Sequence, residues 1–449
     1  MANLWAIIIN LLIIGITIVS TTNDSNVNLF DTAKFTHCFS DKNESTSIVH
    51  DVESTSKQLV FSSNTFAFQL FKQLNKFEIK SNSSGLIYSP SSLYSTLILT
   101  YLGSRGDTER ELRNRLKLND VAKSSIAIAF RAMQLWNNLK STKSTNSSHI
   151  SDVNKLFVAS QLKINSCVRD LFPDYIEAKD FVLQPAESLD SINEWISQHT
   201  AGKINNLLPI GSITPMTKLI MTNAIYFKSN WAQQFDSSKT QKAKFHVSST
   251  EELEVDMMSM ESISLMYGIS EELQVTAVEI PYSSSDYSMV VLLPTQQEKG
   301  LDSLLREINS DNLQDLLHNM VDDDINLSLP KFKAEQEFEL AGPLYSIGIK
   351  KLFDPRYVNL SVIFEDEKDS RQSALNSVLH KSYINVNEEG TEASAATAMI
   401  FARSGRPLFP TQFIANRPFL YLIRDTTSNL ILFMGTVRRP NLNNDPLDQ

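Results

Sequence analysis

The stretch VNEEGTEASAATAMIFARSGRPLFPTQF, residues 386–413, joins a run of small side chains to a basic segment that contains proline. Residues 390–398 are only Gly, Ala, Ser, Thr and one Glu. Such side chains bury too little apolar area to hold a segment in a core of its own. The run has no proline, so its backbone is able to pair as a strand. By itself it is typical either of a flexible surface loop or of a strand that inserts between others.

The alternation of residues in this run favours insertion. With a period of two, one face carries Thr391, Ala393, Ala395 and Thr397, and the other carries Glu392, Ser394, Ala396 and Ala398. A small, uncharged face can slide between two existing strands without forcing them apart. The following residues 403–407, RSGRP, are typical of an exposed loop that offers a basic side chain to a protease pocket.

Several motifs resemble the serpin family. Residues 387–393 (NEEGTEA) are similar to the serpin hinge, and residues 415–420 (ANRPFL) to the signature beyond the reactive loop. The block NAIYFKSNW at 223–231 is highly specific for the family, and residues 85–116 resemble its early strand and the two helices that follow. The motifs occur in the family's order over about residues 58–440, so the chain is identified as a member by resemblance.

This resemblance implies one large α+β domain at 58–440. It would contain a large central mixed β-sheet, two smaller sheets, eight or nine helices, and an exposed reactive-centre loop at about 388–412. The mixed order of predicted helices and strands, without a fixed repeat, favours the same class. The near-continuous apolar run LIMTNAIYF at 219–227 predicts a strand covered on both faces.

The resemblance also assigns roles to individual residues. The residues that match the polar shutter cluster beneath the sheet are Ser89, Ser92, Asn223 and His380, and Trp231 matches the breach, where the loop first enters. The residues that match the hinge are Glu388, Gly390, Thr391, Glu392, Ala393, Ser394, Ala395, Ala396 and Thr397. Buried polar groups must stay hydrogen-bonded in each state, so a shutter of this kind exchanges partners when strands separate. Core packing of Trp231 is compatible with a role in the breach.

In inhibitory serpins a protease cuts the reactive loop, becomes acylated to it, and is trapped when the cut loop inserts into the sheet. The family's loop length places the bait residue at Ser404, and a loop shorter by one places it at Arg403. We favour the Arg403–Ser404 bond, because an acidic pocket of a trypsin-like protease binds a guanidinium through paired hydrogen bonds. A Ser404–Gly405 bond would indicate an elastase-like target. Arg406 is a poor candidate because Pro407 follows it.

Other functions are disfavoured by the sequence. It has no G-x-S-x-G, H-E-x-x-H, P-loop or G-x-G-x-x-G motif, and its seven histidines lack zinc-ligand spacing. We therefore expect no enzyme activity, no cofactor and no metal, with His380 as a buried hydrogen-bonded residue rather than a general base. The net charge of −10 disfavours nucleic-acid binding. The predicted helix at 125–139 has few basic residues, so no strong glycosaminoglycan site is expected. We expect a monomer; the rival function is a non-inhibitory serpin that acts as a carrier or chaperone.

The N-terminal apolar segment and the sequons predict secretion. Residues 4–19 are apolar apart from Asn10 and Thr17, which favours a signal peptide at 1–20 over a signal anchor. Residues 21–57 are polar and predicted to be a disordered extension, and 441–449 a tail. The N-x-S/T sequons predict glycosylation at Asn23, Asn43, Asn82, Asn146, Asn326 and Asn359. Cys38 and Cys167 would either pair or remain two independent thiols, because spacing cannot test geometry.

Overall fold

The computed structural model describes residues 32–39, 52–81, 84–118, 121–143, 148–297, 300–366, 369–370, 373–391 and 409–440. Their mixed helices and strands confirm the α+β class. The α-helices are α2 (Thr32–Phe39), α3 (Val52–Ser81), α4 (Pro90–Gly103), α5 (Gly106–Arg115), α6 (Lys123–Lys143), α7 (Ser166–Leu171), α8 (Pro185–His199), α9 (Gly300–Glu307), α10 (Ser310–His318) and α11 (Ala341–Ser346). The strands are β1 (Ile87–Tyr88), β2 (Ser148–Ala159), β3 (Ile176–Lys179), β4 (Leu219–Asn230), β5 (Gln241–His246), β6 (Glu252–Ser270), β7 (Val275–Pro281), β8 (Tyr287–Pro294), β9 (Val321–Pro330), β10 (Phe332–Glu339), β11 (Leu375–Val386), β12 (Gly390–Thr391), β13 (Thr411–Ile414), β14 (Phe419–Asp425) and β15 (Ile431–Val437).

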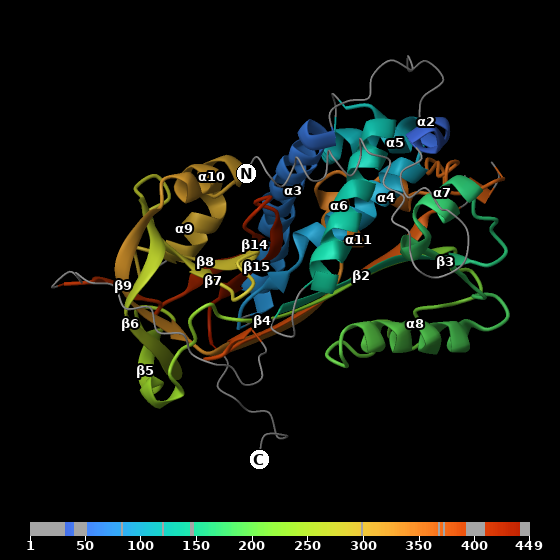
Figure 1. The fold of residues 1–449 in the computed structure, drawn as a ribbon. Coiled ribbons are helices and arrows are strands. Elements are labelled where there is room, and N and C mark those ends of the chain that lie inside the picture. The colour runs from blue at the N-terminus through green and yellow to red at the C-terminus, as the bar shows by residue number, and fades with distance from the viewer. Residues whose placement is uncertain are drawn as a thin grey trace.

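One sheet has six strands in the order β10-β11-β12-β4-β2-β3. It is mixed, because β4 runs parallel to β11 and β3 parallel to β2, whereas the other pairs are antiparallel. Helix α8 covers one face, and α4 packs against the other (Figure 1). This two-sided cover explains why β4 is buried over most of its length, as its apolar run predicts.

The second sheet has nine strands, in the order β1-β15-β14-β8-β7-β6-β9-β13 with β5 paired to β6. The strands expected in two smaller sheets here form one continuous sheet. The 19-residue β6 joins them, because it pairs with β7 near its C-terminal end and with β5 and β9 elsewhere. The register shifts between Met260 and Ile263, where Ser262 has φ 49°, and such a bulge bends a long strand so that it serves both parts.

The start of α4 is set by local chemistry. The Ser89 hydroxyl accepts a hydrogen bond from the Ser92 backbone N–H, and Pro90 occupies the first helical position. A hydroxyl cap and a proline there both suit the unpaired amides of a first turn. The predicted helix start at Ser89-Pro90 is thus confirmed.

The prediction that residues 21–57 lack structure was wrong for two parts of that range. Helix α2 forms at Thr32–Phe39, and α3 begins at Val52. Phe35 and Phe39 are fully buried, and their ring centroids lie 6.1 and 6.0 Å from that of Phe172. A short helix gains its stability from such tertiary contacts, which a window of sequence does not contain. Helices α2–α11 therefore also exceed the eight or nine expected.

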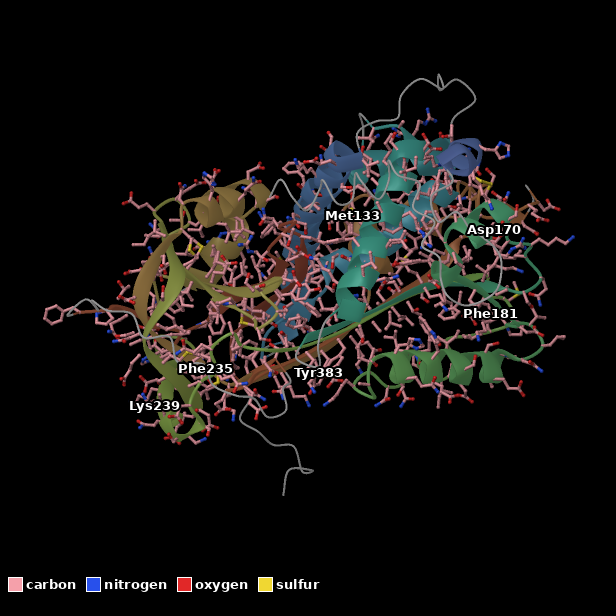
Figure 2. All side chains as sticks on the ribbon, in the orientation of Figure 1. Met133, Asp170, Phe181, Phe235, Lys239 and Tyr383 are labelled. Carbon is pink, nitrogen blue, oxygen red and sulfur yellow. A yellow bond between two sulfur atoms is a disulfide. The ribbon has the colours of Figure 1, made fainter. Side chains whose placement is uncertain are left out.

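A disulfide and an ion pair attach α2 to α7. Cys38 and Cys167 form a disulfide with their Cα atoms 5.6 Å apart. Of the two alternatives that the sequence left open, the structure therefore has the paired cysteines. Lys34 Nζ lies 2.9 Å from Asp170 Oδ2, near the N-terminal helix (Figure 2). The start of the described chain is thereby tied to the body rather than extended from it.

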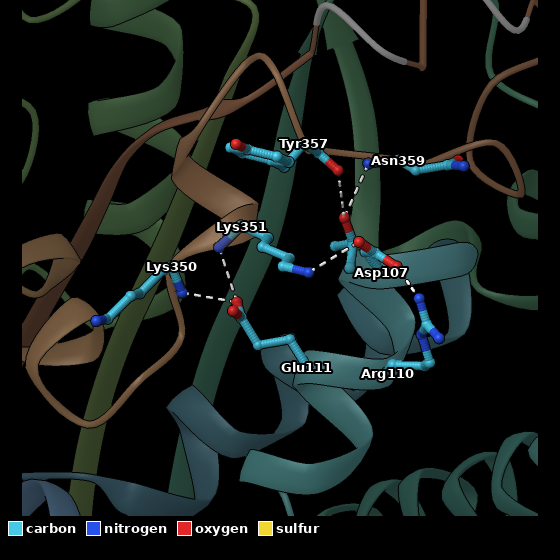
Figure 3. A network of polar contacts seen from close by, with 8 residues as sticks. Asp107, Arg110, Glu111, Lys350, Lys351, Tyr357 and Asn359 are labelled. Atoms are coloured by element: carbon cyan, nitrogen blue, oxygen red, sulfur yellow. Dashed lines mark hydrogen bonds and ion pairs between the residues drawn. The ribbon is translucent and has the colours of Figure 1, made fainter.

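A polar network attaches α5 to the segment after α11 (Figure 3). Glu111 Oε1 accepts hydrogen bonds of 2.7 Å from the backbone N–H groups of Lys350 and Lys351. Lys351 Nζ also donates to Asp107, which pairs with Arg110 as well. Hydrogen bonds from Arg110 and Lys351 lower the pKa of Asp107 from its usual value. The charged side chains are partly exposed at the surface, so the network positions this segment more than it stabilises the fold.

Several predictions concern residues outside the described ranges. These are the signal peptide at 1–20, the tail at 441–449, and the sequons at Asn23, Asn43, Asn82 and Asn146. Of the other two sequons, Asn326 lies half-buried on β9 and Asn359 half-buried in the loop after α11. Among the described helices, none combines the length and apolarity needed to cross a bilayer.

Candidate functional site

The described start of the hinge, Gly390 and Thr391, is already part of the six-stranded sheet. Strand β12 lies between β4 and β11 and is antiparallel to both: Gly390 is in register with Asn230, and Thr391 with Ser229 and Val386. At Gly390, φ is 156° and an added Cβ would lie 2.1 Å from the Ser229 carbonyl oxygen. Glycine is therefore required where the chain passes this close to β4.

Beyond β12, the strands β4 and β11 pair directly with each other. They run parallel through eight register pairs, from Leu219 with Leu375 to Tyr226 with Tyr383. A chain that continued β12 would have to separate these pairs and would then be antiparallel to a neighbour on each side. The sheet is thus open by two residues at one end and closed along the rest.

Trp231 and Tyr282 contact the chain at the end of the sheet where β12 separates β4 from β11. Trp231 is 2% exposed, and its ring stacks on Tyr282 with centroids 4.6 Å apart. Its indole N–H donates to the Asn387 carbonyl at 2.9 Å, and its backbone N–H donates to the Glu389 carbonyl at 2.9 Å. The Tyr282 hydroxyl hydrogen-bonds the Thr391 hydroxyl at 2.9 Å, and burial raises the pKa of Tyr282, so the phenol stays protonated. Trp231 is thus packed in the core and also contacts the chain that leads into β12.

Glu388 anchors the chain just before β12. Its carboxylate lies 3.0 Å from Lys331 Nζ and accepts a hydrogen bond of 2.8 Å from the Thr240 hydroxyl. Its carbonyl accepts from the Phe235 backbone N–H. Burial opposes ionisation of this carboxyl, but the bonds from Lys331 and Thr240 hold its pKa below the usual value. Glu388 is therefore ionised and fixed where the chain turns into β12.

The four predicted shutter residues are fully buried and lie in one polar region at the β4–β11 junction. His380 Nε2 accepts from the Ser89 backbone N–H at 3.0 Å and lies 2.9 Å from the Ser382 hydroxyl. An amide N–H only donates, so Nε2 is the unprotonated nitrogen of a neutral imidazole. Burial lowers the pKa of His380 to about 3. Among the described residues its Nδ1 has no hydrogen-bond partner.

Asn223, on β4, is the register partner of His380 across the pair that must separate. Its Nδ2 donates to Thr96 Oγ1 at 2.6 Å and to Asn154 Oδ1 at 3.0 Å. The Ser92 hydroxyl also donates to Asn154 Oδ1. These bonds connect α4, β2 and β4, whereas His380 connects α4 to β11, so the junction has separate polar partners on its two sides.

Sequence reasoning missed three members of this region. Ser382 follows His380 by two residues, which puts both on the same face of β11. Thr96 follows Ser92 by one turn of α4, so the strand and helix periods could have predicted both residues. Asn154 had none, because its position follows from pairing between β2 and β4, in which it is opposite Asn223. The predicted residues from Glu392 to Thr397, and the bond Arg403–Ser404, lie outside the described residues.

The described residues contain no group of three His, Cys, Asp or Glu side chains that could hold a metal ion. The geometry instead defines a class of protein in which a loop of the same chain begins as a short strand between two strands of a sheet. Farther along, those two strands pair directly with each other. The chain belongs to the serpin family, because the model described as Serpin (serine protease inhibitor) matches residues 61–440. The family is described by serine protease inhibition, and its members are not enzymes.

Individual relatives agree with this assignment. Serine protease inhibitor 88Ea of Drosophila melanogaster is 34% identical over 382 residues, which cover 82% of this chain and 88% of the relative. Human Serpin B3 is 31% identical over 391 residues, covering 84% of this chain and 97% of Serpin B3. The crystal structure of Serpin48 from the insect Tenebrio molitor matches with a TM-score of 0.71 at 27% identity, covering 86% of this chain and 98% of Serpin48. The serpin fold expected from the sequence is thereby confirmed.

Proposed function

We propose that this serpin is a secreted inhibitor of trypsin-like serine proteases that acts by covalent trapping. The protease cuts the reactive loop and is acylated by the residue before the cut. The freed loop then extends β12 between β4 and β11 and carries the enzyme with it, which distorts the enzyme's site before the acyl bond is hydrolysed. The partner is a protease in a covalent complex; no nucleic acid or cofactor takes part.

One observation carries this proposal: Gly390 and Thr391 are already paired between β4 and β11. Thr391 is fully buried, on the face predicted to point inward. The residues that alternate with Thr391 on the same face of the run are small enough to enter the sheet after it; they are Ala393, Ala395 and Thr397. A bulky, charged or proline residue at these positions would favour a non-inhibitory relative.

Strand addition is the source of free energy. An inserted residue hydrogen-bonds on both sides, in place of a parallel pair between β4 and β11. Each net new backbone hydrogen bond contributes about 1 kcal/mol, and antiparallel pairing is slightly more stable per residue than parallel pairing. Ten or more such bonds would offset a large rearrangement, so the uncut molecule is the metastable state.

The bait residue in this proposal is Arg403, with cleavage of Arg403–Ser404. The test is incubation with trypsin, followed by a denaturing gel and mass spectrometry of the released C-terminal peptide. We expect a covalent band and a peptide that begins at Ser404. A peptide that begins at Gly405 would reassign the target to an elastase-like protease. A cut loop without a covalent band would identify a carrier or chaperone instead.

Secretion is supported by the apolar segment at 4–19 and by the disulfide between Cys38 and Cys167, since disulfides persist mainly in oxidising compartments. Expression of the whole chain in insect cells tests this. We expect the protein in the medium, without residues 1–20, and smaller after enzymatic removal of N-linked glycans. Retention in the cytosol at full length would refute secretion and leave the trapping mechanism untouched.

A further inference from the structure

A large cavity lies between the helices α3, α4 and α6 and the strand β2. Its volume is about 1160 Å³, and it extends past the β14–β15 turn toward α10. We call its β2 end the Asp152 pocket. The residues that define this pocket are Tyr94, Phe130, Gln134, Ile150, Asp152 and Tyr175.

Asp152 is the only acidic member of this defined set. It is open to the cavity, and the ion pairs of the described residues do not include it. Two cations on α6 are engaged elsewhere: Lys140 lies 2.5 Å from Asp425, and Arg131 interacts with Asp174 and Tyr175. Although Asp152 is exposed to the cavity, the surrounding protein partly desolvates its carboxyl and raises the pKa of Asp152 to about 6, against a hydrogen bond from Asn154. The ionised carboxylate thus lacks the compensation that a positive partner would supply.

Aromatic rings and an unpaired amide complete the walls. The rings of Phe130 and Tyr175 have centroids 6.2 Å apart. Tyr175 lines the same cavity as Asp152, whose charge adds to burial in raising the pKa of Tyr175. Aromatic faces attract ammonium groups, more strongly where water is excluded. Gln134 is 6% exposed, and neither its Nε2 nor its Oε1 has a hydrogen-bond partner among the described residues.

We propose that the Asp152 pocket is a binding site for a small organic cation that carries an aromatic or aliphatic body. The ammonium group pairs with the Asp152 carboxylate and contacts the rings of Phe130 and Tyr175. The body of the ligand lies along Tyr94 and Ile150, and the Gln134 amide bonds any polar group beside it. The residues of this site do not contact the reactive loop in the proposed trapping step.

Occupation of the pocket bears directly on the closed sheet. Asn154 Nδ2 donates to Asp152 Oδ1 at 2.6 Å, while its Oδ1 accepts from Ser92 and Asn223. Asp152 is also the register partner of Ile225 on β4. A ligand that binds the intact form in preference to the unfolded chain raises its melting temperature, by an amount that grows with the logarithm of ligand concentration over Kd.

The test is isothermal titration of the intact, uncut protein with phenethyltrimethylammonium, and with 2-phenylethanol as the uncharged comparison. We expect saturable binding of the cation with one site, and binding of the alcohol at least about tenfold weaker. D152N should weaken binding of the cation about tenfold or more, since it keeps the side-chain shape and removes the charge. D286N is the matched control, because Asp286 lines the same cavity away from this pocket; it should change affinity less than twofold.

Equal binding of cation and alcohol would overturn the proposal, and so would unchanged affinity in D152N. Loss of cation binding in both D152N and D286N would also contradict it, because the position of the negative charge in the cavity would then not matter. Melting curves of each variant without ligand show whether it is folded. Should D152N not fold, Q134L and F130L replace it, and undiminished cation binding in both would overturn the proposal. A protein that binds the cation but fails to trap a protease would refute the proposed function alone.

Discussion

The substitution Thr391→Arg tests whether trapping depends on the β12 position. Thr391 is fully buried, and its hydroxyl bonds Tyr282 at 2.9 Å. Arginine there loses this hydrogen bond, worth about 1 kcal/mol, and buries a charge without a partner, at a cost of about 3–5 kcal/mol. The few backbone bonds of a two-residue strand cannot offset that cost, so we expect β12 to leave the sheet.

The consequence is a change from inhibitor to substrate. Loop insertion competes with hydrolysis of the acyl-enzyme, and an added barrier of about 3 kcal/mol slows insertion about 100-fold. In an incubation with trypsin, wild-type protein should give a covalent band on a denaturing gel. Thr391→Arg should give almost entirely cleaved inhibitor and free active enzyme. The melting temperature after cleavage should rise for the wild type and stay nearly unchanged for the variant.

Thr391→Ser is the control, because it keeps the hydroxyl and removes only a methyl group. It should trap protease in nearly wild-type yield. A wild-type yield of covalent complex from Thr391→Arg would refute the reasoning, since insertion would then proceed past a buried charge at its first position.

Three further outcomes follow from the same geometry. His380 has a folded-state pKa of about 3 and an ordinary value of 6.5, so the unfolded chain takes up a proton first as pH falls. Urea denaturation should therefore show stability that is complete above pH 6.5 and falls by about 1.4 kcal/mol per pH unit toward pH 3, with a flatter profile in His380→Asn. Replacement of both Cys38 and Cys167 by serine opens a 129-residue loop, and should lower the free energy of unfolding by up to about 5 kcal/mol; an unchanged urea midpoint would contradict this. Gly390→Ala places a Cβ 2.1 Å from the Ser229 carbonyl oxygen, so we expect less covalent complex and more cleaved inhibitor, whereas wild-type partition would show that the hinge does not need this close approach.

Much of the fold could be predicted from short stretches of sequence. The apolar run at 219–227 predicted β4 because a strand covered on both faces needs no polar alternation. Ser89 and Pro90 predicted the start of α4, since the cap and the first helical position are decided by adjacent residues. The resemblance assigned roles to Trp231 and His380, and the structure has Trp231 directly after β4 and His380 on β11, the strands between which the loop is expected to enter.

Long-range contacts account for the misses. Helix α2 depends on Phe172, and its disulfide partner Cys167 is 129 residues away. The joining of two expected sheets depends on β6 having different neighbours along its length. Asn154 becomes part of the shutter only through its register with Asn223. Sequence alternation cannot report which strand a given strand will meet.

By itself, the sequence determined the family, the apolar strands and helix starts, and a hinge of side chains small enough to enter a sheet. These follow from side-chain size, polarity and cap chemistry, which act over a few residues. Only the tertiary structure decided that Gly390 and Thr391 stand between β4 and β11, and that the next residues of those strands are still paired with each other. That arrangement depends on hydrogen bonds between segments far apart in the chain, and their pairing is settled when the whole sheet closes around one core.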